Sequence, residues 1–411
     1  MSTESSRRHF LRRTVVGAGL TAVAGVGVGA SAATAAGQGS QNSQNSQDSE
    51  AVPFHGARQA AILRQPPAQS VVASFDVIAE NRAELTELFR EITDRSRFLT
   101  TGGAPAALGI TAPPADSGVL GPVVPPGSLG VVLGAGSSLF DGRYGLADRK
   151  PAKLKPMTMF PNDALDAAQC HGDLSLTLSA ESTDTVLHAL RDITRATCGG
   201  MQLRWKINGF SSQPRPSGTP RNLMGFKDGI ANPAESEMDR LVWVSGGGEP
   251  AWTTGGSYQV VRLIRMLVEF WDRVSLTEQE NMFGRRRDTG APLDGANEQD
   301  VPRYADDPVG TVIPLTSHIR KANPRTAETD NSRILRRAVN YDRGVDVNGN
   351  LDMGLVFLCY QQDLERQFEA VQKRLVDEPL VDYISPFGGG YFFALPGVTG
   401  PDDHFGRALL A

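Results

Sequence analysis

The chain has 411 residues, which is more than one ordinary domain needs and about right for two or three. Hydrophobic residues make up 40% of it, which excludes a wholly disordered chain. The formal net charge of −5 and the lack of a long basic stretch in the body exclude nucleic acid as the expected partner. The cysteines, Cys170, Cys198 and Cys359, have no paired spacing, so neither a disulfide framework nor a zinc site is expected.

The N-terminus is expected to be a targeting segment. Arg7 and Arg8, followed by Phe10 and Leu11, form a twin-arginine pattern, and small and apolar residues fill the run over 14–36. Gly and Ala make this run only weakly hydrophobic, which disfavours the alternative of a permanent membrane anchor. We therefore predict a twin-arginine signal peptide over residues 1–36 and export by the twin-arginine machinery to a periplasmic, extracellular or cell-surface location.

A segment rich in Ser, Gln and Asn follows and cannot bury a core, so residues 37–65 are expected to be a flexible linker. Beyond it, alternating β-branched and apolar residues predict strands, and apolar residues three and four apart predict helices. The elements expected in the first half are a strand at 70–78, a helix at 81–98, strands at 129–133 and 173–179, a helix at 183–197 and a strand at 202–210.

The second half is expected to repeat this order. Its expected elements are a strand at 257–263, an apolar helix that ends at Trp271, a strand at 353–360, a helix at 364–375 and a strand at 391–395. The order β-α-β-β-α-β is the ferredoxin-like pattern. The chain is therefore expected to be an α+β protein of two ferredoxin-like domains, at 66–235 and 236–411. This duplication rests on element order alone, since the halves share no obvious sequence identity.

Among the histidines, His318 stands apart, because a polar and basic stretch ending at Arg325 follows the apolar run that precedes it. A haem iron needs one axial imidazole, and neighbouring cations suit the carboxylates of a porphyrin. Taken alone, His318 would be an ordinary loop histidine about as often as a ligand, because exposed histidines are common.

A second segment has the pattern Gly-x-x-Asp-Gly, from Gly225 to Gly229, with Asp228 inside it. By itself the pattern is weak, since a turn uses Asp and Gly in the same way. The functional interpretation is a loop whose glycines let the backbone approach a flat cofactor while Asp228 is held over its face.

The third segment contains Arg333, Arg336 and Arg337, interrupted by Ile334 and Leu335. Such a run usually forms a solvated charged face. The apolar interruption also allows a strand with one arginine pointing inward, and an inward arginine needs an anionic or polar partner.

Together the three segments resemble the dye-decolourising (DyP-type) haem peroxidases. The match extends over about residues 66 to 400 and includes the stretches at 354–364 and 386–397. With the twin-arginine pattern, it resembles the exported subclass that includes proteins called deferrochelatase/peroxidase. The resemblance implies haem b in the C-terminal domain and a peroxidase that reduces hydrogen peroxide and oxidises dyes, phenolic or other bulky organic donors through a high-valent iron-oxo intermediate.

The resemblance also implies roles for individual residues. His318 would be the iron ligand, Asp228 the general base that moves a proton between the peroxide oxygens, and Arg336 the cation that stabilises the charge developing as water leaves. Asp363 would be the acidic partner of the histidine. The residues expected against the haem are Gly225, Phe226, Lys227, Gly229, Arg325, Leu355, Phe357 and Asp363, with Lys227 and Arg325 on the propionates. A mildly acidic pH optimum is expected.

Bulky donors would not reach a buried haem edge, so electrons are expected to enter through surface aromatic residues. The candidates are Trp205, Trp243, Trp252, Trp271 and Tyr341, each of which is otherwise a packing residue. Two other functions stay open: a haem-binding iron-supply protein that releases iron from haem, and a non-catalytic interaction protein. An iron- or copper-handling partner and the oligomeric state also stay open at this point.

Overall fold

The computed structural model describes residues 51–411, so the predicted signal peptide and residues 37–50 of the predicted linker lie outside the described residues. Residues 51–65 are not a free linker. Ile62 is buried, and the buried Gln59 side chain bonds to the backbone of Leu133 and Leu395. The folded region therefore starts earlier than the composition indicated. No helix in the described part of the chain is long and apolar enough to cross a membrane.

The first half has the predicted β-α-β-β-α-β order. Its elements are β1 (Gln69–Val77), α1 (Arg82–Thr101), β2 (Gly130–Gly136), β3 (Leu174–Ala180), α2 (Thr183–Ala196) and β4 (Met201–Phe210). Each long helix begins at a capping side chain that accepts an otherwise unpaired backbone N–H. Asn81 accepts the N–H of Glu84 at the start of α1, and Ser182 accepts the N–H of Thr185 at the start of α2. These caps explain why the helices begin close to the predicted positions.

The second half repeats the order with shorter helices and one additional two-residue strand, β6. Its elements are α3 (Met238–Leu241), β5 (Ser257–Met266), α4 (Val268–Trp271), α5 (Leu276–Phe283), α6 (His318–Ala322), α7 (Ala327–Asp330), β6 (Leu335–Arg336), β7 (Val339–Val345), β8 (Leu351–Gln361), α8 (Ala370–Leu375), β9 (Ile384–Ala394) and α9 (Arg407–Leu410). Strand β9 begins well before the predicted Tyr391. Its early part contains Pro386 and Gly388, which are depleted in strands and concealed it from the sequence pattern.

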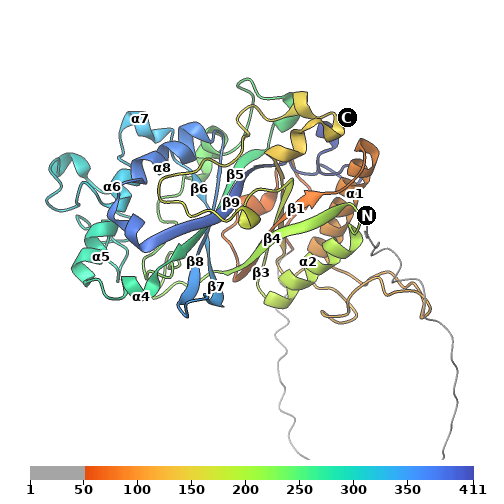
Figure 1. Ribbon diagram of the computed structural model, residues 1–411, viewed down its shortest axis with the longest axis horizontal. Helices are drawn as coiled ribbons and strands as arrows, with labels where there is room; N and C mark the ends of the chain where they lie inside the picture. Colours follow the sequence, from red (N-terminus) through yellow and green to blue (C-terminus); the bar gives the residue numbers. More distant parts are fainter. Residues whose placement is uncertain (1–50) are drawn as a thin grey trace, which may run out of the picture. The chain divides into compact units, whose positions relative to one another are not determined.

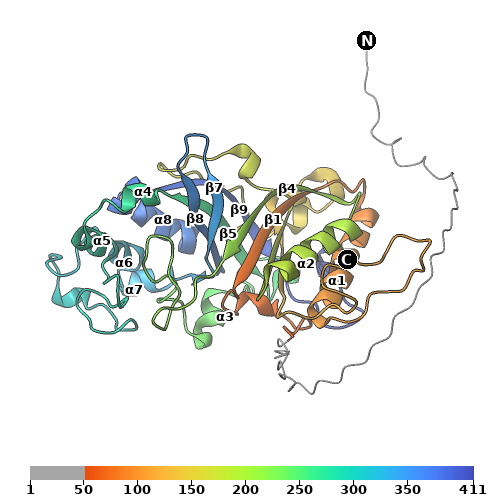
Figure 2. The ribbon, with the colours of Figure 1, turned by 90° about the horizontal axis from the view of Figure 1, so that it is seen from below.

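The strands form one sheet that closes on itself. Their order is β5-β9-β2-β3-β1-β4-β7-β8-β6, and the additional antiparallel pairing of β5 with β8 joins the two sides of that order into a ring. Strands β2 and β9 connect the two halves at one place, and β4 and β7 at another. In Figures 1 and 2, α1 and α2 lie at one end of the molecule and α4 to α8 at the other, with the strands between them.

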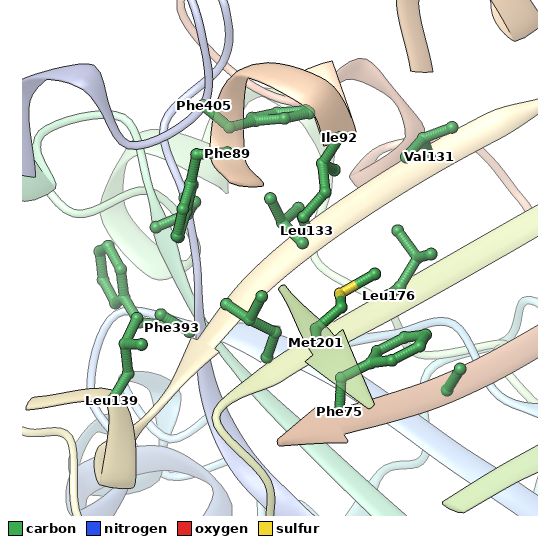
Figure 3. Close-up of a cluster of buried hydrophobic side chains, with 14 of the residues drawn as sticks. Phe75, Phe89, Ile92, Val131, Leu133, Leu139, Leu176, Met201, Phe393 and Phe405 are labelled. Carbon is green, nitrogen blue, oxygen red and sulfur yellow. The ribbon is translucent and has the colours of Figure 1, made fainter. Parts of the chain in front are cut away.

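The hydrophobic core has separate parts that match this arrangement. One cluster packs α1 and α2 against the strands, with Phe89, Ile92 and Leu176 completely or nearly buried (Figure 3). A second cluster contains side chains from strands of both halves, among them Val72 and Val261. A further cluster includes Phe226, Trp271 and Leu355, all in or beside the second half. Phe283 packs against this last cluster, and its ring lies beside that of His318.

Candidate active site

The loop that contains Gly225 and Gly229 is fixed by its own hydrogen bonds. The side-chain oxygen of Asn222 accepts the backbone N–H of Met224 at 3.1 Å and of Phe226 at 3.2 Å. Gly225 has φ +88° and Gly229 has φ +108°, so both adopt a backbone conformation that a side chain disfavours. The glycines of the pattern are thus required by a tight turn that presents Asp228.

Asp228 and Arg336 form an ion pair, with Arg336 Nη1 donating to Asp228 Oδ1 at 3.0 Å. The amide of Asn232 joins the loop to β6: its oxygen accepts the Arg336 N–H at 2.8 Å, and its nitrogen donates to the Arg336 carbonyl at 3.2 Å. The structure therefore brings together the two residues expected to act on peroxide. Asn232 holds the backbone of Arg336, a role that the sequence motif did not reveal.

His318 is the first residue of α6, and neighbouring arginines hold this short helix in place. Arg320 donates to the carbonyls of Asp307 at 2.7 Å and of Ile313 at 2.9 Å. Arg374 of α8 donates to the carbonyls of Lys321 and Ala322, each at 3.0 Å. The histidine is therefore anchored from both sides, as a metal ligand needs to be.

The acidic partner of His318 is Glu378, not Asp363. His318 Nδ1 lies 2.8 Å from Glu378 Oε2, and the glutamate side chain is only 3% exposed. Asp363 instead accepts the backbone N–H groups of Glu365 and Arg366 at 2.9 Å and pairs with Lys153. The prediction for Asp363 is wrong in this respect, because that carboxylate caps the turn that follows β8.

Charges around His318 raise its pKa. Burial alone would lower the pKa, but the Glu378 carboxylate, through its charge and its hydrogen bond, outweighs this effect. Arg336 lowers the pKa and Asp228 raises it, so both act on the imidazole electrostatically. With Nδ1 bonded to Glu378, the other ring nitrogen, Nε2, is the one available as a ligand.

Apolar and aromatic side chains surround these polar groups. Phe226 stacks on Phe283 with ring centroids 3.9 Å apart, and Phe283 lies 6.1 Å from the His318 ring. Leu355 belongs to the same cluster, and Phe357 packs against it. The predicted residues Phe226, Leu355 and Phe357 are therefore close to one another, and Phe283 is an additional wall residue that the sequence did not single out.

Cations gather beside the same site. Arg285 is buried, and its pKa falls to about 10 because of burial, while the charges of Arg325 and Arg336 contribute in the same direction. Lys227 is engaged elsewhere, bonded to Glu298 and to the carbonyl of Ser217. Arg285 is also bonded, since its Nη1 donates to the carbonyls of Gly290 at 2.6 Å and Glu298 at 3.0 Å. Arg285 was missed because its sequence neighbours are ordinary surface arginines.

The aromatic residues expected at the surface are buried. Trp205, Trp243, Trp252, Trp271 and Tyr341 are each at most 8% exposed, so direct contact between any of them and a bulky donor is excluded. Each ring is large and mostly apolar, so its burial in the core stabilises the fold.

These residues fit a haem. One imidazole is anchored with Nε2 available, apolar rings form walls, and buried cations suit carboxylates. Within residues 51–411, no group of three or more His, Cys, Asp or Glu side chains is arranged to hold a metal ion directly.

Comparisons with known proteins agree with this geometry. Residues 59–211 match the family model of the Dyp-type peroxidase N-terminal part, and residues 219–399 match that of the C-terminal part. The chain is 52% identical over 371 residues to the Deferrochelatase of Escherichia coli K12, covering 88% of each. The Deferrochelatase of Shigella flexneri is as similar, with 52% identity over 371 residues and 88% of each chain covered.

Solved structures show the same similarity. A DyP-type peroxidase from Cellulomonas bogoriensis matches with a TM-score of 0.80 and 36% identity, covering 88% of this chain and 99% of that one. Ferric DtpA from Streptomyces lividans matches with a TM-score of 0.80 and 35% identity, covering 88% of this chain and 98% of that one.

Proposed function

The chain belongs to the Dyp-type peroxidase family, whose members are haem oxidoreductases, and from that premise we propose how its own residues serve the reaction. The group bound would be haem b, held by His318 through Nε2. Asp228 and Arg336 would act on the hydrogen peroxide that the bound haem would reduce. The observation that carries this proposal is the 3.0 Å ion pair between these two side chains, within electrostatic range of an anchored histidine.

When bound, the haem supplies the electrons that cleave the peroxide O–O bond. The protein supplies the proton transfer: a carboxylate oxygen of Asp228 accepts the proton from one peroxide oxygen and delivers it to the other, which leaves as water. Arg336 is held by Asn232 and stabilises the negative charge that develops on the leaving oxygen. Glu378 keeps a hydrogen bond on Nδ1 of His318, which raises the basicity of the ligand.

Bulky donors are oxidised at the protein surface in this proposal. Of the five aromatic residues first considered, Trp271 alone is in contact with Phe283, with ring centroids 5.8 Å apart, and Phe283 neighbours His318. Trp271 also contacts Tyr383 at 5.1 Å, and Tyr383 stacks on Phe270, which is half exposed. Trp271 is therefore the candidate that connects the site to the surface.

The test of the main proposal is peroxide-dependent oxidation of an anionic dye by the purified holoprotein. We expect turnover with peroxide and none without it, with an optimum at mildly acidic pH. A flat rate from mildly acidic to alkaline pH would contradict the expected optimum. Trp271→Phe should slow oxidation of the bulky dye more than that of a small phenol, and equal rates for both donors would exclude Trp271 from electron transfer.

A second activity is favoured by the names of the relatives, since proteins called Deferrochelatase are 52% identical to this chain. In this alternative the chain releases iron from haem and leaves the porphyrin intact. Incubation of the protein with haem in the absence of peroxide, followed by porphyrin fluorescence, separates the two activities. Porphyrin that accumulates without peroxide supports iron release, and its absence together with dye turnover supports the peroxidase alone.

The proposed location is outside the cytoplasm, reached through the twin-arginine pattern at Arg7 and Arg8. The export machinery is then the one protein partner that the sequence supports. Replacement of both arginines by lysine should retain the protein in the cytoplasm, as measured by cell fractionation. Export of that variant would contradict this assignment.

A further inference from the structure

The arginine next to Arg336 has no assigned role in the peroxidase reaction. Arg337 is buried, and its guanidinium donates to three backbone carbonyls: Ile62 at 3.1 Å, Arg336 at 3.0 Å and Leu63 at 2.5 Å. Within residues 51–411, no carboxylate forms an ion pair with it. Burial accordingly lowers its pKa to about 10. Carbonyl dipoles satisfy the N–H groups but leave the positive charge without a counter-charge.

A small cavity lies against this charge. It has a volume of about 20 Å³, and strands β1, β2, β3 and β8 contribute to its wall. Hydroxyl groups are its main polar feature apart from the arginines, and no aspartate or glutamate lines it. The lining side chains with a hydroxyl group are Ser70, Thr177, Ser179 and Tyr360.

A second cation stands at the same cavity. Arg64 lines it and is half-buried, and its hydrogen bond goes to the carbonyl of Ser128. The remaining wall is apolar, with Val132 and Leu358 among its residues. Two arginines and several residues with a hydroxyl group therefore line a space to which no aspartate or glutamate contributes.

We propose that this cavity binds a monovalent inorganic anion of halide size. A volume of about 20 Å³ holds roughly one water-sized particle, which favours a small inorganic ion over an organic carboxylate. Water would satisfy the hydrogen bonds of the hydroxyl groups, but it would not compensate the buried charge of Arg337, and an uncompensated buried charge is costly. A halide accepts hydrogen bonds from guanidinium and hydroxyl donors and supplies the missing negative charge.

The cavity is connected to the Asp228–Arg336 pair through one carbonyl group. Arg337 Nη1 and Asn232 Nδ2 both donate to the carbonyl oxygen of Arg336, at 3.0 Å and 3.2 Å. An anion that fixes the Arg337 side chain therefore also fixes the backbone from which Arg336 extends toward Asp228. Anion binding itself does not depend on the proposed peroxidase chemistry, so the two proposals fail separately.

The experiment uses bromide and chloride as probes on the purified holoprotein. Crystals grown or soaked in bromide should show an anomalous peak between Arg64 and Arg337. In solution, chloride should raise the thermal midpoint more than gluconate does at the same ionic strength, because gluconate is too large for the cavity. Arg64→Gln should raise the apparent Kd for chloride by at least about tenfold, which corresponds to roughly 1.4 kcal/mol.

The matched control is Arg407→Gln, since Arg407 is an exposed arginine whose hydrogen bond also goes to a backbone carbonyl, that of Asp402. It should leave the chloride response unchanged. Arg337→Gln removes three carbonyl contacts and can prevent folding, so Arg64→Gln and the wild-type bromide peak decide the question. Only water in the cavity at saturating bromide, or an equal chloride response in Arg64→Gln and Arg407→Gln, would overturn the proposal.

Discussion

The segment that follows the first strand differs between the two halves of the chain. In the N-terminal half it is α1, an unbroken helix from Arg82 to Thr101 that buries Leu85 and Phe89 against the sheet. In the C-terminal half the corresponding segment, after β5, contains only short helices, and it contains His318. A continuous amphipathic helix uses its inner face for packing. A broken segment can instead direct charged and ligating side chains inward.

The same comparison holds for the glycine loop and the arginine segment. Asp228 lies in the loop before β5 and Arg336 in β6, and both fall within residues 219–399, which match the C-terminal family model. The N-terminal half thus contributes mainly stability, whereas the C-terminal half and the glycine loop that precedes β5 contribute the catalytic side chains. The predictions below test this division.

The largest effect is expected from His318→Ala. Removal of the imidazole should abolish stable haem binding, an effect larger than the roughly 10- to 100-fold losses seen when an outer partner of a metal ligand is removed. Titration of the apoprotein with haem, followed by the Soret band, measures this. His55→Ala is the control, because His55 lies far from the site in sequence and bonds to Arg97. Equal haem affinity in both variants would contradict the assignment.

Asp228→Asn and Arg336→Gln should keep haem and lose peroxide turnover. Loss of a general base typically costs about 10²- to 10⁴-fold, and loss of a charge-stabilising group about 10²- to 10³-fold. The rate of the spectral change after mixing with peroxide measures each effect. Since the side chains form one pair, the double variant should lose less than the product of the single losses. Wild-type rates in both single variants would exclude this site.

Phe89→Ala should affect stability and leave the chemistry intact. Phe89 is fully buried in the N-terminal core, and such a substitution costs about 3 to 5 kcal/mol. Urea unfolding of the holoprotein measures the loss. The turnover per folded, haem-loaded molecule should match the wild type. A specific loss of turnover in the folded fraction would break the proposed division between the halves.

Glu378→Gln should weaken haem binding or peroxide turnover by about 10- to 100-fold, because the carboxylate orients the ligand and increases its basicity. Asp363→Asn is the matched control, because Asp363 caps a turn and does not contact His318. The ligand-field bands of the ferric protein should shift in the first variant and not in the second. The reverse pattern would restore Asp363 as the partner.

The smallest effect concerns Glu237, whose pKa falls from 4.5 to about 2 because Arg333 bonds to it. A carboxylate with a lowered pKa stabilises the fold above its unfolded pKa, near 4.5, and this contribution is lost as the pH falls toward 2. Partial exposure limits it to about 1 kcal/mol. Glu237→Gln should therefore reduce stability at pH 6 and flatten the acid limb of the stability profile. An unchanged acid limb would show that the pair contributes nothing.

Much of the fold and part of the candidate site could be predicted from the sequence. The strands and helices of the first half follow from alternation, helical spacing and capping residues such as Asn81. Each local pattern around His318, Asp228 and Arg336 was weak alone, and their roles were proposed because the three segments together resemble the dye-decolourising peroxidases. The ferredoxin-like order of both halves likewise needs only the sequence of elements.

What the sequence could not reveal depends on long-range contacts. Glu378 is 60 residues from His318 along the chain, and no local pattern connects the two. Asn232 acts through its amide on the backbone of Arg336, which leaves no sequence signal. The burial of Trp271 and Tyr341 was also missed, because ring size alone does not show whether an aromatic side chain lies in a core or on a surface.

The absorption spectrum of the purified holoprotein, recorded before and after one equivalent of hydrogen peroxide, decides whether the protein turns over peroxide. We expect a Soret band that shifts on mixing with peroxide and returns when a dye is added. In Asp228→Asn the same band should be present and shift far more slowly. A Soret band that only bleaches, or one that does not respond to peroxide in the wild type, would contradict the account.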